Sequence, residues 1–222
     1  SNFFHQDLRL DCGSYGFEAP IQVWTEGTAK DIWKCLGPIW RGINSMKKVN
    51  IDGEEKLRGG SLVEASYMSA FRLGTYIATQ FKPNVAKAIY QMTDAKKVLD
   101  TSCGWGDRLA GFYTSDAEEY IGCDPNPNTF NQYYKQIETY EKLLGNTDVK
   151  IHAGRMTEDS PSFIGVEGKK KVRIYRCGAE DLPWDEINNV DCAFTSPPYF
   201  STEEYNKGGE HEEDQSWSKF NE

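Results

Sequence analysis

The sequence predicts an α/β fold with an open, doubly wound and largely parallel sheet. Short apolar segments alternate with helix-forming segments over residues 96–196, a glycine-rich turn follows the first short segment, and two prolines follow the last. Because parallel strands need a crossover between them, strands that alternate with helices form a sheet with right-handed crossovers.

The length and composition allow one large domain, or a core domain with a small appendage. Of the 222 residues, 38% are hydrophobic and 13% aromatic, which is ample for a buried core and argues against general disorder. No apolar run approaches the roughly 18 residues of a membrane span, and no signal-peptide pattern opens the chain. We therefore expect no membrane association.

The cysteines and histidines predict neither a disulfide framework nor a metal site. The six cysteines, at positions 12, 35, 103, 123, 177 and 192, are widely spaced and form no Cys-x-x-Cys pair. His5, His152 and His211 each lack a second histidine at ligand spacing. We interpret the cysteines as reduced, mostly buried thiols of a cytoplasmic protein.

The net charge of −9 is distributed unevenly. Residues 201–222 contain seven acidic and two basic residues, which gives that segment −5 and leaves −4 for the first 200 residues. Affinity for nucleic acid depends largely on neutralising phosphates, so this charge counts against a nucleic-acid partner.

The first part of the chain predicts an N-terminal extension, residues 1–60, ahead of a domain spanning 61–222. The polar stretch 47–60 predicts an exposed loop or hairpin, and residues 61–80 begin as a predicted helix. Residues 81–92 predict a second helix, with Pro83 at its start and Asn84 as its cap. Its predicted buried face consists of Val85, Ala88, Ile89 and Met92.

The regular pattern begins at residue 96. Residues 96–100, 119–124, 171–177 and 190–196 predict strands, and residues 108–115 and 125–145 predict helices. Asn126 caps the second helix, Pro127 occupies its first turn and Gly145 closes it. Residues 146–171 are longer than a connection requires and predict a surface insertion. The predicted buried stripe of the second helix consists of Phe130, Tyr133, Tyr134, Ile137, Tyr140 and Leu144.

Three polar or glycine-rich segments follow predicted strands. In residues 101–107, Gly104 and Gly106 would let the backbone approach a ligand closely, although alone this signal is weak because tight βα turns of this kind are common without a ligand. Asp124, 24 residues after Asp100, is expected to bind ribose hydroxyls or merely to cap the strand. The turn 178–180 either meets an adenine ring or caps a helix.

The segment "TSPPYF", residues 195–200, ends the fourth predicted strand. Proline cannot donate to a sheet ladder, so Pro197 and Pro198 terminate the strand. The turn then presents Ser196 and Tyr199 beyond the carboxyl end of the sheet, which is where ligands bind in open α/β sheets.

Over residues 80–200 these features together resemble the S-adenosylmethionine-dependent amino-methyltransferases that modify exocyclic amines of DNA bases. Their hallmark is Asp/Asn/Ser-Pro-Pro-Tyr/Phe/Trp, and the serine form is most typical of cytosine-N4 enzymes. The resemblance implies a Rossmann-like class I methyltransferase sheet and S-adenosylmethionine as cofactor. It also implies duplex DNA with a flipped base as substrate, as in restriction-modification, in a bacterial or phage-infected cell.

The resemblance also implies roles for individual residues. Ser196 and the Pro197 carbonyl would accept hydrogen bonds from the base amine, and Tyr199 would stack on the base, a contact worth about 1–3 kcal/mol. The segment around 81–90 would help hold the methionine end of the cofactor. The implied catalytic residues are Ser196, Pro197, Pro198 and Tyr199, and the implied cofactor-binding residues are Lys82, Pro83, Asp100, Thr101, Cys103, Gly104, Gly106, Asp124, Ala179 and Glu180.

The chain departs from the family pattern in two respects. Thr101, Ser102 and Trp105 replace the usual Pro, Phe and Ser of the first turn, and Gly178 replaces a polar residue. The family sheet continues for about three more strands, so we expect a sheet that is incomplete at its C-terminus. Adenine-N6 or RNA-guanine methylation, modification of a protein glutamine, and a non-catalytic binding module remain alternatives.

Overall fold

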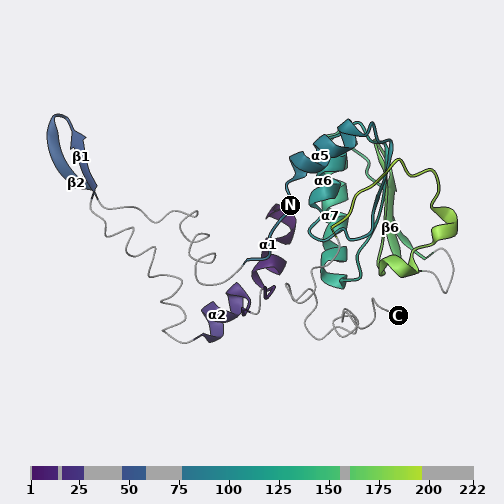
Figure 1. Cartoon of the computed structure of the whole chain (residues 1–222), viewed down its shortest axis with the longest axis horizontal. Coiled ribbons are helices and arrows are strands. Elements are labelled where there is room, and N and C mark those ends of the chain that lie inside the picture. Colours follow the sequence, from purple (N-terminus) through teal and green to yellow (C-terminus); the bar gives the residue numbers. More distant parts are fainter. Residues whose placement is uncertain (1, 15–16, 28–46, 59–76, 156–160, 197–222) are drawn as a thin grey trace. The chain divides into compact units, whose positions relative to one another are not determined.

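The computed structural model describes residues 2–14, 17–27, 47–58, 77–155 and 161–196 (Figure 1). The chain divides into two units, one of residues 1–8, 79–200 and 206–222 and the other of residues 9–78 and 201–205. The expected domain boundary between residues 60 and 61, like the helix expected after residue 60, lies outside the described residues.

The smaller unit contains the predicted hairpin. Strands β1 (Lys47–Ile51) and β2 (Glu54–Arg58) pair antiparallel around the turn Asp52-Gly53. Both turn residues have positive φ, 53° and 84°, as the two-residue turns that match strand twist require. Helix α2 (Pro20–Glu26) also belongs to this unit, and Pro20 occupies its first turn.

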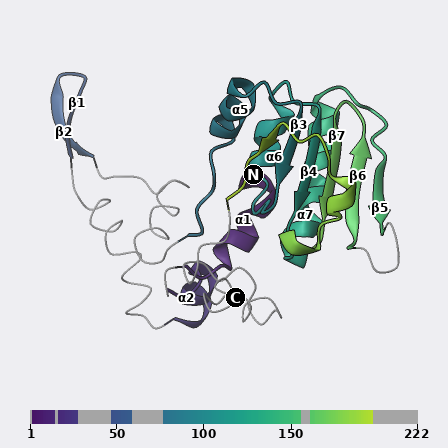
Figure 2. The ribbon, with the colours of Figure 1, turned by 45° about the vertical axis from the view of Figure 1, so that its right-hand side comes forward.

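The larger unit contains a six-stranded sheet in the order β5-β6-β7-β4-β3-β8. Figure 2 shows β3, β4, β7, β6 and β5 side by side. Strands β3 (Lys97–Asp100), β4 (Glu119–Cys123), β7 (Lys171–Tyr175) and β8 (Cys192–Ala193) are parallel. The prediction of a doubly wound α/β sheet is confirmed.

The strand order reverses at β3. The chain runs from β3 to β4 and on to β7 on one side, and then returns to place β8 on the other side of β3. Helices α5 (Pro83–Met92), α6 (Asp107–Tyr113) and α7 (Pro127–Leu143) lie on one face, while the 3-10 helices η1 (Ala179–Asp181) and η2 (Trp184–Glu186) lie on the other (Figure 1). The carboxyl ends of β3 and β8 therefore flank a topological switch point.

The expectation that residues 146–171 form a surface insertion was wrong. Strands β5 (Ile151–Gly154) and β6 (Phe163–Glu167) extend the sheet antiparallel from β7. Ile164 and Val166 are buried in the core, which gives this segment a reason to join the sheet. The ammonium of Lys170 donates to the carbonyls of Ser115 (2.7 Å) and Phe112 (3.1 Å), so it closes the C-terminal end of α6.

The buried face of α5 also differs from the prediction. Ala86 and Tyr90 are buried, whereas Val85 and Met92 are exposed, and Lys82 rather than Asn84 is the N-terminal cap. The reason is a close approach to α6. A Cβ at Gly111 would lie 2.6 Å from the Ala86 Cβ. Glycine at this position therefore allows α5 to pack closely against α6 through the face that carries Ala86.

Helix α7 is confirmed in its termini and partly in its stripe. The Asn126 side chain accepts a hydrogen bond from the Asn128 amide, Pro127 is the first residue, and Gly145 has φ 85°. Phe130, Tyr133 and Ile137 are buried, but Tyr134 and Leu144 are exposed. Gln136 and Glu141 are buried on this helix instead.

The parallel strands are buried on both faces. Val98, Tyr120 and Ile174 belong to the core beneath the α-helices, while their neighbours Leu99, Ile121 and Tyr175 belong to a second cluster on the opposite face. This alternation explains why the strands read as short continuous apolar runs. None of the helices in the described ranges has the length and apolar character needed to cross a membrane.

We expect Gly122→Ala to destabilise the larger unit. The new Cβ would lie 2.3 Å from Cys103 Sγ and 3.0 Å from Tyr120 Cε1, and such overpacking costs about 1–3 kcal/mol. Urea unfolding followed by circular dichroism measures the loss. Gly154→Ala in β5 is the matched control, because no heavy atom lies within 4 Å of its new Cβ. Equal stability of the two variants would contradict the prediction.

Candidate functional site

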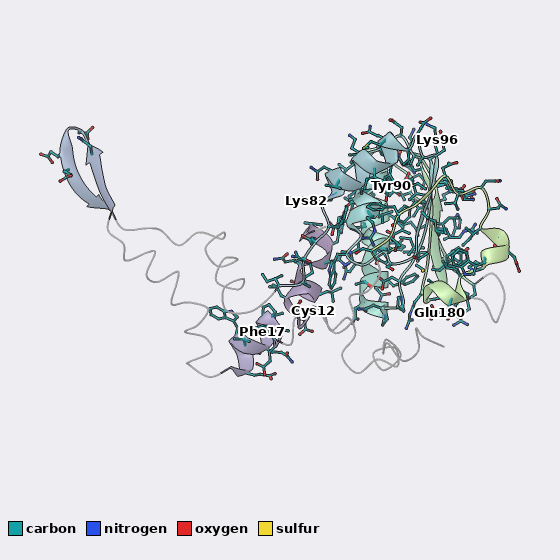
Figure 3. The ribbon with its side chains drawn as sticks, viewed as in Figure 1. Cys12, Phe17, Lys82, Tyr90, Lys96 and Glu180 are labelled. Atoms are coloured by element: carbon teal, nitrogen blue, oxygen red, sulfur yellow. The ribbon has the colours of Figure 1, made fainter. Side chains whose placement is uncertain are left out.

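The candidate site is built on the turn between β3 and α6, residues 101–106, here called the glycine turn. Gly104 has φ 54° and Gly106 has φ 68°, and Gly106 is also the N-terminal cap of α6. Side-chain-bearing residues rarely adopt such conformations, so the predicted need for glycine at these positions is confirmed for the backbone. Figure 3 labels Lys96, just before β3, and Glu180, after β7, at opposite ends of the sheet.

The two glycines differ in what surrounds them. A Cβ at Gly106 would lie 2.2 Å from the Gln136 side-chain oxygen, so this glycine allows α7 to pack closely on the turn. Among the described residues, a Cβ at Gly104 would have only the Ser102 carbonyl oxygen nearby, at 3.8 Å. The surroundings of Gly104 are therefore less crowded than those of Gly106 in this part of the chain.

Four backbone amides of the glycine turn donate hydrogen bonds within the protein. A turn that binds phosphate instead points its free amides at the ligand. These internal bonds fix the shape of the turn and take up donors that a pyrophosphate would need. They run from Ser102 to Asp100 Oδ1 (3.2 Å), from Cys103 to the Cys123 carbonyl (2.9 Å), from Gly104 to Asp124 Oδ2 (2.8 Å) and from Gly106 to the Cys103 carbonyl (3.0 Å).

Asp100 is fully buried beneath the turn and is held by three kinds of donor. Its Oδ2 accepts hydrogen bonds from Arg108 Nε (2.7 Å) and the Tyr120 hydroxyl (2.6 Å), and its Oδ1 accepts the bond from the Ser102 amide (3.2 Å). Burial alone would lower the pKa of Arg108, but the charge and hydrogen bond of Asp100 raise it above its ordinary value. The contact between Arg108 and Asp100 fixes the start of α6 to the end of β3.

Asp124, at the end of β4, is buried and accepts four hydrogen bonds. Oδ1 accepts from the Asn126 amide (3.0 Å) and the Thr129 hydroxyl (2.9 Å), and Oδ2 accepts from the Gly104 amide (2.8 Å) and the Tyr133 hydroxyl (3.1 Å). Burial raises the pKa of Asp124 to about 6, against the lowering effect of these bonds. Its carboxylate therefore joins the glycine turn to α7, and the ribose contact stays a prediction.

The sequence reasoning missed the two side chains of α7 that hold the turn. The Tyr133 hydroxyl donates to the Gly104 carbonyl as well as to Asp124, and Gln136 Nε2 lies 3.5 Å from the Gly106 carbonyl. Both residues lie on the inner face of α7, where only apolar residues were considered. A glutamine within an apolar stripe was the signal that could have indicated a polar contact there.

The start of the Ser-Pro-Pro-Tyr segment lies beside the glycine turn. After β8, the Phe194 amide donates to the Leu99 carbonyl (2.9 Å), and the Thr101 hydroxyl donates to the Thr195 hydroxyl (3.2 Å). Ser196 directly follows and is half-buried. The other predicted catalytic residues, Pro197, Pro198 and Tyr199, lie outside the described residues.

The segment before α5 reaches the same region. Phe81 packs edge-on against Phe194 with ring centroids 5.6 Å apart, and the Arg108 guanidinium lies 5.9 Å from the Phe81 ring. Lys82 and Pro83 follow directly, and Lys82 is exposed. The structure thus places the predicted methionine-end segment near the ends of β3 and β8.

The predicted adenine turn makes contacts within itself, and its contact with an adenine ring stays a prediction, while the cysteines take conventional structural roles. The Trp184 indole donates to the Ala179 carbonyl (3.0 Å), and a Cβ at Gly178 would lie 2.4 Å from a Glu180 carboxylate oxygen, so side chains of this turn fold back on it. Burial raises the pKa of the Cys103 thiol, which packs against Gly122. The cysteines within the described ranges are free, and four are buried, namely Cys12, Cys103, Cys123 and Cys177.

Because burial raises the pKa of Asp124 to about 6, we expect a stability contribution that depends on pH. The folded state holds this proton more tightly than the unfolded chain, so the contribution is complete below about pH 4 and is lost as the pH rises to about 6. The free energy of unfolding of the wild type, relative to Asp124→Asn, should fall over this range in urea titrations. Asp185→Asn, an exposed carboxylate, should leave the wild-type profile unchanged. A constant difference between wild type and Asp124→Asn would contradict this prediction.

No protein-family model matches the chain, and the comparison with curated proteins found no match. One solved structure similar to it is Trm1 from Pyrococcus horikoshii in complex with S-adenosyl-L-methionine, with a TM-score of 0.36 and 17% sequence identity. The match covers 46% of this chain and 26% of that chain, so this chain spans a minor part of Trm1. Similarity at this level assigns neither a family nor an activity.

Proposed function

We propose that the chain binds S-adenosylmethionine at the glycine turn and transfers its methyl group to an exocyclic amine of a DNA base, most readily cytosine N4. The fit of the cofactor rests on the space beside Gly104, where a Cβ would have no neighbour among the described residues closer than 3.8 Å. When bound there, S-adenosylmethionine supplies an electrophilic methyl group on a positively charged sulfur.

The charges around the turn favour this cofactor over a dinucleotide. Asp100, Asp107 and Asp124 are buried around the turn, with Arg108 as their cationic neighbour. Asp107 is the first residue of α6, where a carboxylate counteracts the positive helix terminus that would attract phosphate. With four turn amides also engaged internally, a cofactor that carries cationic groups and no phosphate matches the turn best.

The observation that carries the activity is the contact between the glycine turn and Thr195, the residue before the Ser-Pro-Pro-Tyr segment. The Thr101 hydroxyl donates to the Thr195 hydroxyl at 3.2 Å, one residue before Ser196. The cofactor-binding turn and the residue expected to hold the base amine therefore lie at the same edge of the sheet. Such alignment is the main requirement of a direct methyl transfer, because no metal or covalent intermediate has to form.

The chain's own residues would align and polarise the amine. The Ser196 hydroxyl and the Pro197 carbonyl would accept its hydrogen bonds and orient its lone pair, and Tyr199 would stack on a base flipped out of the duplex. A serine before the prolines favours cytosine N4 over adenine N6. The net charge of −5 on residues 201–222 would repel the DNA backbone and so counts against tight DNA binding.

We expect S-adenosylmethionine to bind in isothermal titration, and NAD not to bind, because the turn offers carboxylates in place of phosphate donors. Gly104→Ala should weaken the binding of S-adenosylmethionine about tenfold or more. The alanine side chain would be strained at a φ of 54° and would enter the space proposed for the ligand. Gly145→Ala is the matched control. That glycine has φ 85° and open surroundings but lies at the end of α7, so its replacement should leave the affinity unchanged. NAD binding tighter than S-adenosylmethionine would refute the cofactor assignment.

We expect N4-methylcytosine as the product when the protein is incubated with labelled cofactor and duplex DNA, single-stranded DNA or RNA. Nucleoside mass spectrometry identifies the modified base. Ser196→Ala should lower the methylation rate about tenfold or more by removing one acceptor, with cofactor affinity retained. Tyr199→Phe should retain most activity and Tyr199→Ala should lose it, because stacking requires only the ring.

Each outcome of this experiment has a definite meaning. Detection of N6-methyladenine would support methyl transfer to DNA but would change the target base from cytosine to adenine. Label only in RNA or protein, or no label despite measured cofactor binding, would overturn the DNA methyltransferase proposal.

A further inference from the structure

The N-terminal residues of the larger unit contact the glycine turn through one histidine. His5 lies on α1 (Asn2–Leu10) and is fully buried. Its ring centroid is 6.0 Å from that of Trp105, which lies between the two glycines of the turn, and 5.7 Å from that of Tyr133. Sequence reasoning had dismissed this histidine as isolated, because its partners lie about a hundred residues away along the chain.

His5 also fixes the orientation of Gln136. The Gln136 side-chain oxygen can only accept a hydrogen bond, so His5 Nε2–H donates to it, at 3.3 Å. The amide nitrogen of the same side chain then faces the Gly106 carbonyl, at 3.5 Å. Reversing the carboxamide would place its oxygen opposite the Gly106 carbonyl oxygen, so that two acceptors would face each other.

The carboxamide of Gln136 also sets the position of Gly106. Because a Cβ at Gly106 would lie 2.2 Å from the Gln136 oxygen, the side chain packs directly on the glycine Cα. Glycine at φ 68° has wide conformational freedom of its own, so neighbouring groups must hold the backbone in this shape. Gln136 does this for Gly106, just as Asp124 and Tyr133 do for Gly104.

A second contact attaches the same helix to α7. Phe4 packs edge-on against Tyr140 with ring centroids 5.7 Å apart, and Tyr140 packs against Tyr113 of α6 at 5.1 Å. These aromatic contacts hold α1 against α7 and bring His5 to Gln136. The arrangement separates a packing contact, made by Phe4, from a polar contact directed at the turn, made by His5.

We propose that His5 is a positioning residue of the cofactor site, which acts through Gln136 to hold Gly106 and the glycine turn in the conformation that binds ligand. This inference rests on the proposed function for the identity of the ligand. The N-terminal segment would then be part of the site. Gln136 would contact Gly106 of the turn directly, and His5 would hold Gln136 in place.

The test compares two measurements in the full chain. Hydrogen–deuterium exchange of residues 101–107 reports on the turn without any ligand, and isothermal titration with S-adenosylmethionine reports on binding. His5→Leu fills the buried position with an apolar side chain but removes the hydrogen-bond donor. In this variant we expect faster exchange of the turn amides and about five- to tenfold weaker binding of S-adenosylmethionine. His5→Gln, whose amide can still donate to Gln136, should recover most of both properties.

Two further variants separate positioning from general stability. Asp7→Ala, an exposed residue of the same helix, should leave exchange and affinity unchanged. Gln136→Leu should reproduce the loss of affinity, and the double variant with His5→Leu should lose little more than either alone, because both act through one contact. Additive losses in the double variant would contradict the pathway through Gln136.

The possible failures are distinguishable. Unchanged exchange of residues 101–107 in folded His5→Leu overturns the inference, whatever the binding result. Faster exchange with unchanged S-adenosylmethionine affinity overturns the link between His5 and the ligand. Absence of S-adenosylmethionine binding by the wild type overturns the proposed function, while the exchange measurement still decides whether His5 holds the turn. If His5→Gln does not restore the exchange protection and the affinity that His5→Leu loses, His5 contributes by packing alone, and the inference is overturned.

Discussion

The carboxylate of Asp124 is the interaction on which the site depends. It joins the Gly104 amide of the turn to the Thr129 and Tyr133 hydroxyls of α7, and it also accepts a bond from the Asn126 amide. A buried carboxylate is costly unless donors surround it, so the turn and the helix are both fixed by the need to satisfy this one group. Without it, the Gly104 amide would lose the hydrogen bond that joins the turn to Asp124.

Polar groups are concentrated where the sheet needs them. Beneath the turn, Asp100 pairs with Arg108 and accepts the Tyr120 hydroxyl, while the rest of the core around β3 and β4 is apolar or aromatic. A buried ion pair contributes little net stability, but removing one partner is strongly destabilising. Such a pair therefore defines one arrangement of strand, turn and helix more than it strengthens the fold.

Local pattern was enough to predict the four parallel strands, the turn and the ends of α7, because short apolar runs, glycine pairs and an Asn-Pro cap act over a few residues. Long-range contacts decided the rest. The buried face of α5 depends on Gly111 of α6, and the pairing of β6 with β7 depends on a core that no local pattern describes. The partner of His5 lies 131 residues away, so no window of sequence could have indicated it. Ser196 was predicted by its motif and lies at the expected edge, whereas the rest of that motif lies outside the described residues.

The donors around Asp124 change how ligand binding at this edge has to be understood. Each of its oxygens already faces one backbone amide and one hydroxyl, and the single hydrogen of each hydroxyl is shared with a backbone carbonyl. A ribose hydroxyl that bonds to Asp124 would therefore replace or share one of these donors, and the donors on Oδ2 come from Gly104 and Tyr133, which shape the turn. The net gain from such an exchange is small, since one protein hydrogen bond is traded for one to the ligand. In the proposed site, the shape of the turn and the occupancy would thus be coupled through a single carboxylate, and a group that steadies Gly104 or Gly106 from behind would influence affinity without touching the ligand.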